Sequence, residues 1–388
     1  MSNNPKRIVI LGSTGSVGRQ ALEIIAVDEG LSICGLAAGS NWRLLSEQAG
    51  NFRPDAVAIA EPAAAGELSK VLPEDTDLLT GPEAMSDLIW QVRPDMVLTA
   101  VVGSAGLTPT LTAIECGADL AIANKESLVM AGAIIMPAAR RAGINVLPVD
   151  SEHSAIFQCL VGHETEDVHR VTLTASGGPF RNQPPEKARR ASLAEVLKHP
   201  TWRMGRKISI DSATMMNKAL EIIETHHLFD LPVHRIEVVI HPESIVHACV
   251  EFFDGSVLAQ MSRPAMTTPI SFALHYPARP DRPSAPLLDL TETGCLHFEA
   301  VDMQKYPALE LGYEVVRRGG TAGAVLNAAN ETAVEAFIAG RIQFGQIVEI
   351  VKEVLSETPT KTEIDLETVL VADDEARRRT EEIVTGSQ

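Results

Sequence analysis

The chain has 388 residues, and 45% of them are hydrophobic, so two or three domains with a substantial core are expected. Its formal net charge of −18 argues against nucleic acid, where phosphate neutralisation drives binding, and no basic helix suits a membrane surface. An anionic substrate must therefore be bound by a local group of cations.

The cysteines indicate a reducing compartment. They are dispersed and include no CxxC pair, which is typical of free thiols and not of a zinc site or a disulfide framework. These residues are Cys34, Cys116, Cys159, Cys249 and Cys295. The first apolar run is too short for a signal peptide, and no apolar run has the length of a membrane span. We therefore expect a cytoplasmic protein.

Residues 1–150 alternate short apolar runs with helical patterns, which predicts an α/β domain with a Rossmann-like, doubly wound parallel sheet. Helical patterns include Gly18–Val27 and Leu107–Cys116. The expected strands are Arg7–Leu11, Ser32–Ala37, Ala56–Ala60, Met96–Thr99, Leu120–Ala123 and Asn145–Val149. Their runs of Val, Ile and Ala lack polar alternation, as in strands covered on both faces.

The pattern changes after residue 150. Residues 151–275 predict a central α+β domain, and the proline-rich residues 276–300 predict a linker. Residues 301–388 predict a C-terminal helical bundle. The expected strands are His169–Ala175, Ile236–Ile240, Ala248–Phe253 and Ser256–Met261, and the expected late helices are Glu310–Arg318, Thr321–Ala339, Gly345–Leu355 and Asp373–Val384.

A glycine-rich turn, Gly12–Gly18, follows the first strand and opens a helix. Glycines at such a turn let the backbone approach a pyrophosphate, and the helix N-terminus supplies free N–H groups. The spacing is GxxGxxG, which is weak alone but favours dinucleotide binding at the first strand of an α/β domain.

The end of the second strand indicates which dinucleotide is bound. It has no acidic residue for a ribose hydroxyl, and Ser40, Asn41 and Arg43 could instead contact a 2′-phosphate, which favours NADP. The alternative is an ordinary polar loop. Asn124 and Glu126 follow a later strand, where they could face the ligand crevice, begin a helix, or do both.

Two acidic stretches predict a cation site. Asp150 and Glu152 point the same way if their segment is extended, although Ser151 and its acidic neighbours also suit a helix start. In the second stretch Asn217, Lys218 and Glu221 share one helical face, with a surface Lys–Glu pair as the alternative. Carboxylate ligands favour Mg²⁺ or Mn²⁺ over zinc.

Two loops could contact a substrate. Ser176 begins a polar turn, Ser176–Pro179, whose hydroxyl and N–H groups could bind an oxyanion. Residues 199–206 combine His199, Trp202 and Gly205 with a proline, a composition that suits a lid over the substrate. The alternative is a packed surface loop. We expect the histidines at positions 153, 226, 227, 241 and 247 to be structural.

Taken together, the chain resembles the 1-deoxy-D-xylulose 5-phosphate reductoisomerase family over nearly its whole length. The motifs that carry the resemblance are Gly12–Gly18, Ala123–Ser127, Asp150–His153, Ala175–Phe180, His199–Gly205, Asp211–Lys218 and His241–Ser244. The resemblance implies a cytoplasmic homodimer that uses NADPH and Mn²⁺ or Mg²⁺ to convert 1-deoxy-D-xylulose 5-phosphate to 2-C-methyl-D-erythritol 4-phosphate, in non-mevalonate isoprenoid biosynthesis. Fosmidomycin typically inhibits members of this family.

The resemblance also implies residue roles. The metal ligands would be Asp150, Glu152 and Glu221, and with Lys125 and His199 they would be the catalytic residues. The substrate would contact Lys125, Ser151, Glu152, Ser176, His199, Ser212, Asn217, Lys218 and Glu221. NADPH would contact Thr14, Gly15, Ser16, Val17, Gly39, Ser40, Asn41, Asn124, Glu126 and Gly205. Many family members carry Lys or Arg where this chain has Ser40.

Two other functions remain open from the residues alone. One is a metal-free NADP-dependent dehydrogenase of a semialdehyde or sugar, with Lys125 as its acid/base. The other is a regulator that binds the dinucleotide without turnover, although no helix-turn-helix or basic patch is present for a partner.

Overall fold

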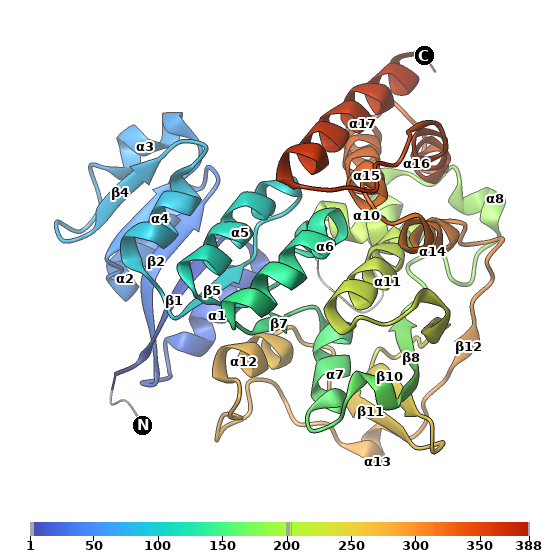
Figure 1. Ribbon diagram of the computed structural model, residues 1–388, viewed down its shortest axis with the longest axis horizontal. Coiled ribbons are helices and arrows are strands. Elements are labelled where there is room, and N and C mark those ends of the chain that lie inside the picture. The colour runs from blue at the N-terminus through green and yellow to red at the C-terminus, as the bar shows by residue number, and fades with distance from the viewer. Residues whose placement is uncertain (1–3, 199–201, 203, 387–388) are drawn as a thin grey trace. The chain divides into compact units, whose positions relative to one another are not determined.

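The structure is a computed structural model that describes residues 4–198, 202 and 204–386 (Figure 1). Its contacts divide the chain into two compact units. The first comprises Met1–Asn124, Ile135–Ser154 and Ala265–Pro286; the second comprises Lys125–Ile134, Ala155–Pro264 and Leu287–Gln388. Within the described residues, no helix combines the length and the apolar character needed to traverse a lipid bilayer.

The first unit is built on a seven-stranded parallel sheet with the strand order β4-β3-β2-β1-β5-β6-β7. Its strands are β1 (Lys6–Leu11), β2 (Leu31–Ala38), β3 (Ala56–Ile59), β4 (Asp77–Thr80), β5 (Met96–Thr99), β6 (Asp119–Ile122) and β7 (Val146–Pro148). The order reverses between β1 and β5, and in such sheets ligands bind at this switch point, outside the carboxyl ends of the strands.

The predicted doubly wound sheet is confirmed, with one strand missed. The edge strand β4 has no fully buried residue, so it lacks the apolar run by which the other strands were found. The helices of this unit are α1 (Ser16–Ile25), α2 (Trp42–Phe52), α3 (Pro62–Leu68), α4 (Ala84–Val92), α5 (Leu107–Cys116) and α12 (Thr267–His275). Helix α12 packs on α1, although it lies far along the chain.

Two helices contribute residues to both units. Helix α6 (Lys125–Ala142) departs from helical geometry at Ala131 and contains Pro137. Helix α7 (Ser151–Leu160) follows β7. The contact division falls after Ile134 in α6 and after Ser154 in α7. The predicted boundary at residue 150 therefore lies close to the second division, while the predicted division into three domains stays a prediction.

The second unit contains a five-stranded mixed sheet with the order β11-β10-β8-β9-β12. Its strands are β8 (Val168–Ala175), β9 (Ile236–Ile240), β10 (Val246–Phe252), β11 (Val257–Met261) and β12 (Glu299–Ala300). Strands β8 and β9 are parallel, and the other pairs are antiparallel. The two-residue strand β12 comes from the expected linker and pairs with β9.

Helices cover this sheet and extend beyond it. They are α8 (Pro185–Ala188), α9 (Leu193–Val196), α10 (Arg206–Thr214), α11 (Met216–Phe229), α13 (Leu290–Thr293), α14 (Ala308–Arg318), α15 (Ala322–Ile338), α16 (Gln346–Glu357) and α17 (Leu366–Gly386). Helix α14 packs tightly on α11, because a Cβ on Gly312 would lie 2.6 Å from the carbonyl oxygen of Ala219. Helices α15 and α17 lie side by side (Figure 1), which confirms the predicted C-terminal bundle.

Candidate active site

The glycine-rich turn lies at the switch point of the parallel sheet. Gly12 has φ of +85°, and a Cβ there would lie 2.5 Å from the carbonyl oxygen of Ala100, which follows β5. A Cβ on Gly18 would lie 2.4 Å from the carbonyl oxygen of Gly12. Helix α1 begins after Gly15 without a side-chain cap. The two glycines thus let the turn pack directly on the backbone after β5 and on the first turn of α1, and the helix start keeps uncapped N–H groups, as a pyrophosphate requires.

A buried polar pair holds this turn in place. The Ser13 hydroxyl donates to Gln48 Oε1 over 2.7 Å, and Gln48 Nε2 donates to the Ser13 carbonyl over 2.9 Å. Both residues are buried. Sequence reasoning missed this pair, since nothing local connects a serine in a loop with a glutamine in α2. Only the structure shows that the buried amide of Gln48 is hydrogen bonded to this turn.

The loop after β2 is exposed and polar, as expected. Gly39 and Ser40 are exposed, and the side chain of Asn41 caps α2 by accepting from the Leu44 N–H over 3.3 Å. The guanidinium of Arg43 lies 4.6 Å from the ring centre of Trp42. The loop therefore offers polar groups and one nearby cation, and its contact with NADPH stays a prediction.

Asn124 is fully buried and precedes α6. Its Nδ2 donates to the carbonyl oxygens of Val101 and Gly103, each over 3.0 Å, so the side chain fixes the loop after β5. A Cβ on Gly106 would lie 2.4 Å from its Oδ1. Asn124 thus fixes the loop that follows β5, and β5 is the strand beside β1 at the switch point.

The segment Asp150–Glu152 is not extended. Asp150 lies in a bend, and Ser151 and Glu152 form the first turn of α7, so the assumed extended geometry is wrong. The two carboxylates nevertheless converge as predicted, with oxygens of Asp150 and Glu152 within 4.8 Å of each other. Asp150 Oδ1 accepts from the Ser151 N–H over 3.0 Å, and the Ser151 hydroxyl donates to Glu152. The helix-start interpretation holds, because backbone N–H groups at a helix start need acceptors.

Helix α11 carries the second predicted set on one face. Asn217 Nδ2 donates to Glu221 Oε1, and Lys218 Nζ donates to Glu221 Oε2, each over 2.5 Å. The side chains of Lys218 and Glu221 are 4% and 0% exposed, so this is not a surface pair. The predicted convergence is confirmed, because residues three and four apart share a helical face.

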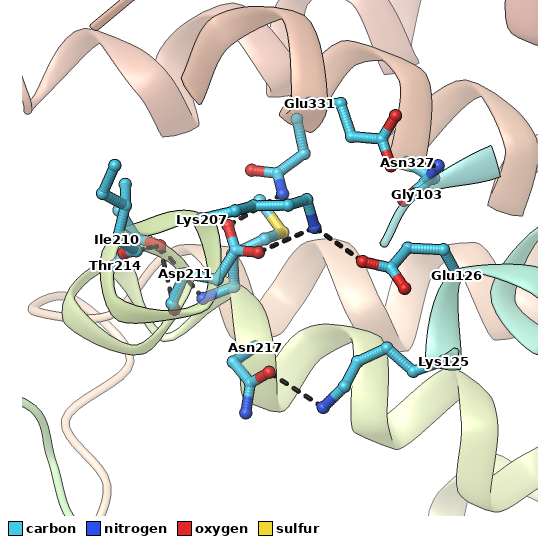
Figure 2. Close-up of polar contacts among 12 residues, drawn as sticks. Gly103, Lys125, Glu126, Lys207, Ile210, Asp211, Thr214, Asn217, Asn327 and Glu331 are labelled. Atoms are coloured by element: carbon cyan, nitrogen blue, oxygen red, sulfur yellow. Dashed lines mark hydrogen bonds and ion pairs between the residues drawn. The ribbon is translucent and has the colours of Figure 1, made fainter. Parts of the chain in front are cut away.

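Lys125, at the start of α6, joins this set within the second unit. Its Nζ donates to Asn217 Oδ1 over 2.9 Å (Figure 2). The same nitrogen lies 3.7 Å from Glu221 Oε1. The next residue, Glu126, accepts from Lys207 Nζ over 3.0 Å. Burial is the largest influence and tends to raise the pKa of Glu126, but the charge of Lys207, the hydrogen bonds to the carboxylate and the charge of Lys125 together outweigh burial and keep this pKa below its usual value.

The predicted oxyanion turn packs on the end of α10. Gly177 and Gly178 have φ of +80° and +66°, and a Cβ on Gly178 would lie 2.9 Å from the carbonyl oxygen of Ser212. The Gly178 N–H donates to Ser176 Oγ over 3.2 Å. The Tyr306 hydroxyl holds the turn from the other side by donating to the Gly177 carbonyl over 2.9 Å.

The predicted lid is only partly visible. His199 lies outside the described residues, as do positions 200, 201 and 203. The ring of Trp202 lies 6.4 Å from that of His247, and Gly205 is exposed at the N-cap of α10. Lid movement and the contacts of His199 and Gly205 therefore stay predictions.

His241 is structural, as expected. Its Nδ1 lies 2.8 Å from the carbonyl oxygen of His297, and its Nε2 accepts from the N–H groups of Ile245 and Val246, each over 3.1 Å. Since Nε2 accepts, Nδ1 carries the proton and donates to His297. The ring thus satisfies backbone groups in the turn before β10.

The first unit has a parallel sheet with a glycine-rich turn at its switch point, and the second has buried lysines and carboxylates. These features are typical of a dinucleotide-binding oxidoreductase. Family models match residues 8–132, described as 1-deoxy-D-xylulose 5-phosphate reductoisomerase, and residues 146–229 and 261–379, described as C-terminal domains of the same family. The chain belongs to the 1-deoxy-D-xylulose 5-phosphate reductoisomerase family.

Relatives match over nearly the whole chain. The reductoisomerase of Heliobacterium modesticaldum is 48% identical over 388 residues, covering 99% of both chains. That of Chlorobium phaeovibrioides is 47% identical over 376 residues, covering 96% of this chain and 98% of the relative.

Solved structures match in the same way. The Zymomonas mobilis enzyme in complex with NADPH has a TM-score of 0.91 and 40% identity, covering 98% of this chain and 99% of that one. A DOX-P reductoisomerase in complex with NADPH, fosmidomycin and magnesium has a TM-score of 0.93, 40% identity and 98% coverage of both chains.

Proposed function

We propose that this protein converts 1-deoxy-D-xylulose 5-phosphate to 2-C-methyl-D-erythritol 4-phosphate, with NADPH and a divalent cation. Family membership supports the reaction. The observation that carries it in this chain is the buried face of α11, where Asn217, Lys218 and Glu221 converge and Lys125 joins them. Cation, amide and carboxylate together suit a phosphorylated sugar and a hard metal ion.

The first unit fits NADPH. Gly12 and Gly18 let the turn pack closely on neighbouring backbone, where a Cβ would clash, and the uncapped start of α1 suits a pyrophosphate. NADPH would be held by Thr14, Gly15, Ser16, Val17, Gly39, Ser40, Asn41, Asn124, Glu126 and Gly205. Arg43, the first cation after this loop in the sequence, would be available for a 2′-phosphate.

The carboxylates Asp150, Glu152 and Glu221 would hold Mg²⁺ or Mn²⁺. An all-oxygen set of acidic ligands fits these ions and not zinc. Solved relatives that contain magnesium support the cation. When bound, the cation would supply Lewis acidity and NADPH would supply a hydride.

The side chains of the second unit would orient the substrate. Ser176, Ser212, Asn217 and Lys218 would bind the phosphate, and the glycine turn at 177–178 sets the spacing of the two serines. Ser151 and His199 would also contact substrate. Lys125, held by Asn217 before substrate arrives, would lie beside the reacting carbons and donate hydrogen bonds to substrate oxygens. Binding energy from the remote phosphate would orient the reacting end.

The test is oxidation of NADPH in the presence of 1-deoxy-D-xylulose 5-phosphate, followed by the nicotinamide absorbance. We expect turnover with added Mg²⁺ or Mn²⁺ and none after EDTA treatment, with recovery when the cation is restored. Comparing the two ions decides which supports the faster rate. Turnover that persists in EDTA would instead support the metal-free dehydrogenase, while NADPH binding without oxidation would support a regulator.

We also propose a homodimer that works in the cytoplasm. The edge strand β11 pairs only with β10 in the described chain, and its Val257 and Leu258 are 55% and 40% exposed. An apolar edge of this kind is a template for pairing with a second copy. The five free thiols support a reducing compartment. Sedimentation equilibrium tests the dimer, and a single species of monomer mass would contradict it.

A further inference from the structure

Two bridges link the start of α6 to α10 and α11 within the second unit (Figure 2). In the outer bridge, Lys125 donates to Asn217 over 2.9 Å. In the inner bridge, Lys207 Nζ donates to Glu126 Oε1 over 3.0 Å and to Asp211 Oδ2 over 2.9 Å. The two bridges start from adjacent residues of α6, so together they set the position of its first turn.

The inner bridge is shielded from water. The side chains of Lys207, Glu126 and Asp211 are 18%, 9% and 2% exposed. Burial alone lowers the pKa of Lys207, but the charges of Asp211, Glu126 and Glu331 outweigh burial and place this pKa above its usual value. Lys207 is therefore charged over the working range of pH, and its two ion pairs lie where screening by salt is weak.

Residues of helices α15 and α17 hold the inner bridge through further hydrogen bonds and ion pairs. Asn330 Nδ2 donates to Asp211 Oδ1 over 2.9 Å, so Asp211 is held from both sides. Glu331, the third carboxylate that acts on Lys207, accepts from Arg377 over 2.6 Å, and Arg377 also pairs with Asp373. The bridge is thus part of a connected polar network, which resists displacement better than an isolated pair.

We propose that Lys207 is a positioning residue, which keeps Lys125 in place when the outer bridge is given up to substrate. The inference rests on the proposed function, in which Lys125 and Asn217 both bind substrate. Their mutual hydrogen bond is then open to exchange for bonds to the ligand, because both groups would contact it. The inner bridge uses Glu126, which follows Lys125, and Asp211, which precedes Ser212. Because it does not use the residues proposed to bind substrate, it can persist through this exchange.

The experiment compares Lys207→Met with Lys207→Arg. Rates are divided by the number of NADPH-binding sites from a fluorescence titration, which removes inactive protein from the comparison. For Lys207→Met we expect kcat to fall roughly 10–100-fold, as for loss of an orienting contact behind a reactive group. The KM for the sugar phosphate should stay within about threefold, because Ser176 and Lys218 are not part of the bridge. Lys207→Arg should restore kcat to within about fivefold of the parent, since it keeps a donor cation.

The matched structural control is Arg318→Met. Arg318 is 25% exposed and donates to the carbonyl oxygens of Leu355 and Thr358, so it joins α14 to the end of α16. Its hydrogen bonds to described residues involve neither α6 nor α10. We expect a lower Tm for this variant and a kcat per NADPH site equal to that of the parent. Lys207→Met should lower kcat at a temperature well below the Tm of both variants.

The double variant Lys207→Gln, Asp211→Asn covers the case in which Lys207→Met does not fold, because it removes the cation and one of its anions together. We expect its kcat to fall at least tenfold. An active parent with Lys207 variants whose kcat stays within twofold would overturn the positioning role, and so would a loss that Arg318→Met reproduces. An inactive parent would instead overturn the proposed function.

Discussion

Gly178 and Ser212 approach so closely that a Cβ on Gly178 would lie 2.9 Å from the Ser212 carbonyl oxygen. Gly178 also has φ of +66°, which side chains rarely adopt. The turn that carries Ser176 and the helix that carries Ser212 can therefore pack together only because this position lacks a side chain. Two serines 36 positions apart, the difference between 212 and 176, are thereby brought to one place.

Gly178→Ala should separate the two serines and weaken phosphate binding. We expect KM for the sugar phosphate to rise about tenfold, and stability to fall by about 1–3 kcal/mol from backbone strain. Gly340→Ala is the control, because Gly340 has φ of +73° with no atom near the added Cβ. It should lose about 1–2 kcal/mol without any change in KM. Equal KM values in the two variants would argue against a phosphate site at this turn.

Gly18→Ala should impair dinucleotide binding, because the new Cβ would lie 2.4 Å from the backbone oxygen of Gly12. The turn must then move away from its present position, and we expect the Kd for NADPH to rise at least tenfold, about 1.4 kcal/mol. Gly50→Ala is the control, since Gly50 is exposed on α2 with nothing nearby. It should stabilise the protein by about 0.5–1 kcal/mol with an unchanged Kd. A fluorescence titration of NADPH measures both variants.

Glu221→Gln should remove a proposed metal ligand while leaving the dinucleotide site intact. We expect metal-dependent turnover to fall at least about 100-fold, about 2.7 kcal/mol, and Mn²⁺ binding by calorimetry to weaken. The Kd for NADPH should stay within about twofold. Glu310→Gln, which alters an exposed carboxylate paired with Arg317 on α14, is the control and should keep the parent rate. Full metal-dependent activity in Glu221→Gln would contradict the ligand assignment.

His227 should make stability depend on pH. Burial, followed by the charge of His226, lowers the pKa of His227 to about 4, and a Cβ on Gly132 would lie 2.4 Å from its ring. The unfolded chain, with a histidine pKa of about 6.5, binds a proton that the native state does not bind between pH 6.5 and 4. The free energy of unfolding should therefore fall by about 3–4 kcal/mol as pH falls through this window, and should level off below it.

Urea unfolding at several pH values measures this dependence. His227→Asn should flatten the decline between pH 6.5 and 4, whereas His226→Gln should largely preserve it. A decline of equal size in His227→Asn and in the parent would assign the effect to other groups.

Local patterns predicted most of the fold. Helix α15 was expected at Thr321–Ala339 and lies at Ala322–Ile338, and strand β5 lies at the expected residues. Their signals are apolar periodicities within one element, which sequence alone reveals. Strands β4 and β12 were missed, because one is an exposed edge and the other has only two residues. Helix α17 begins at Leu366, before the expected Asp373, because its first two turns are mostly apolar and rich in β-branched residues, which have a lower helix propensity.

In the two acidic stretches, local spacing likewise predicted one part of the geometry and not the other. The face shared by Asn217, Lys218 and Glu221 was predictable, because helical spacing alone brings residues three and four apart together. The extended geometry assumed for Asp150 and Glu152 was wrong, because α7 starts at Ser151, directly after the bend. A short polar segment after a strand is compatible with either conformation until its hydrogen bonds are known.

By itself the sequence determined the family, the glycine-rich turn and the residues predicted to bind metal, substrate and NADPH. The tertiary structure alone decided that Lys207 joins Glu126 to Asp211, and that Gly178 packs on Ser212. Glu126 and Lys207 are 81 positions apart, so no local spacing relates them. Their contact arises because chain folding buries opposite charges together, and a buried lysine must have such partners.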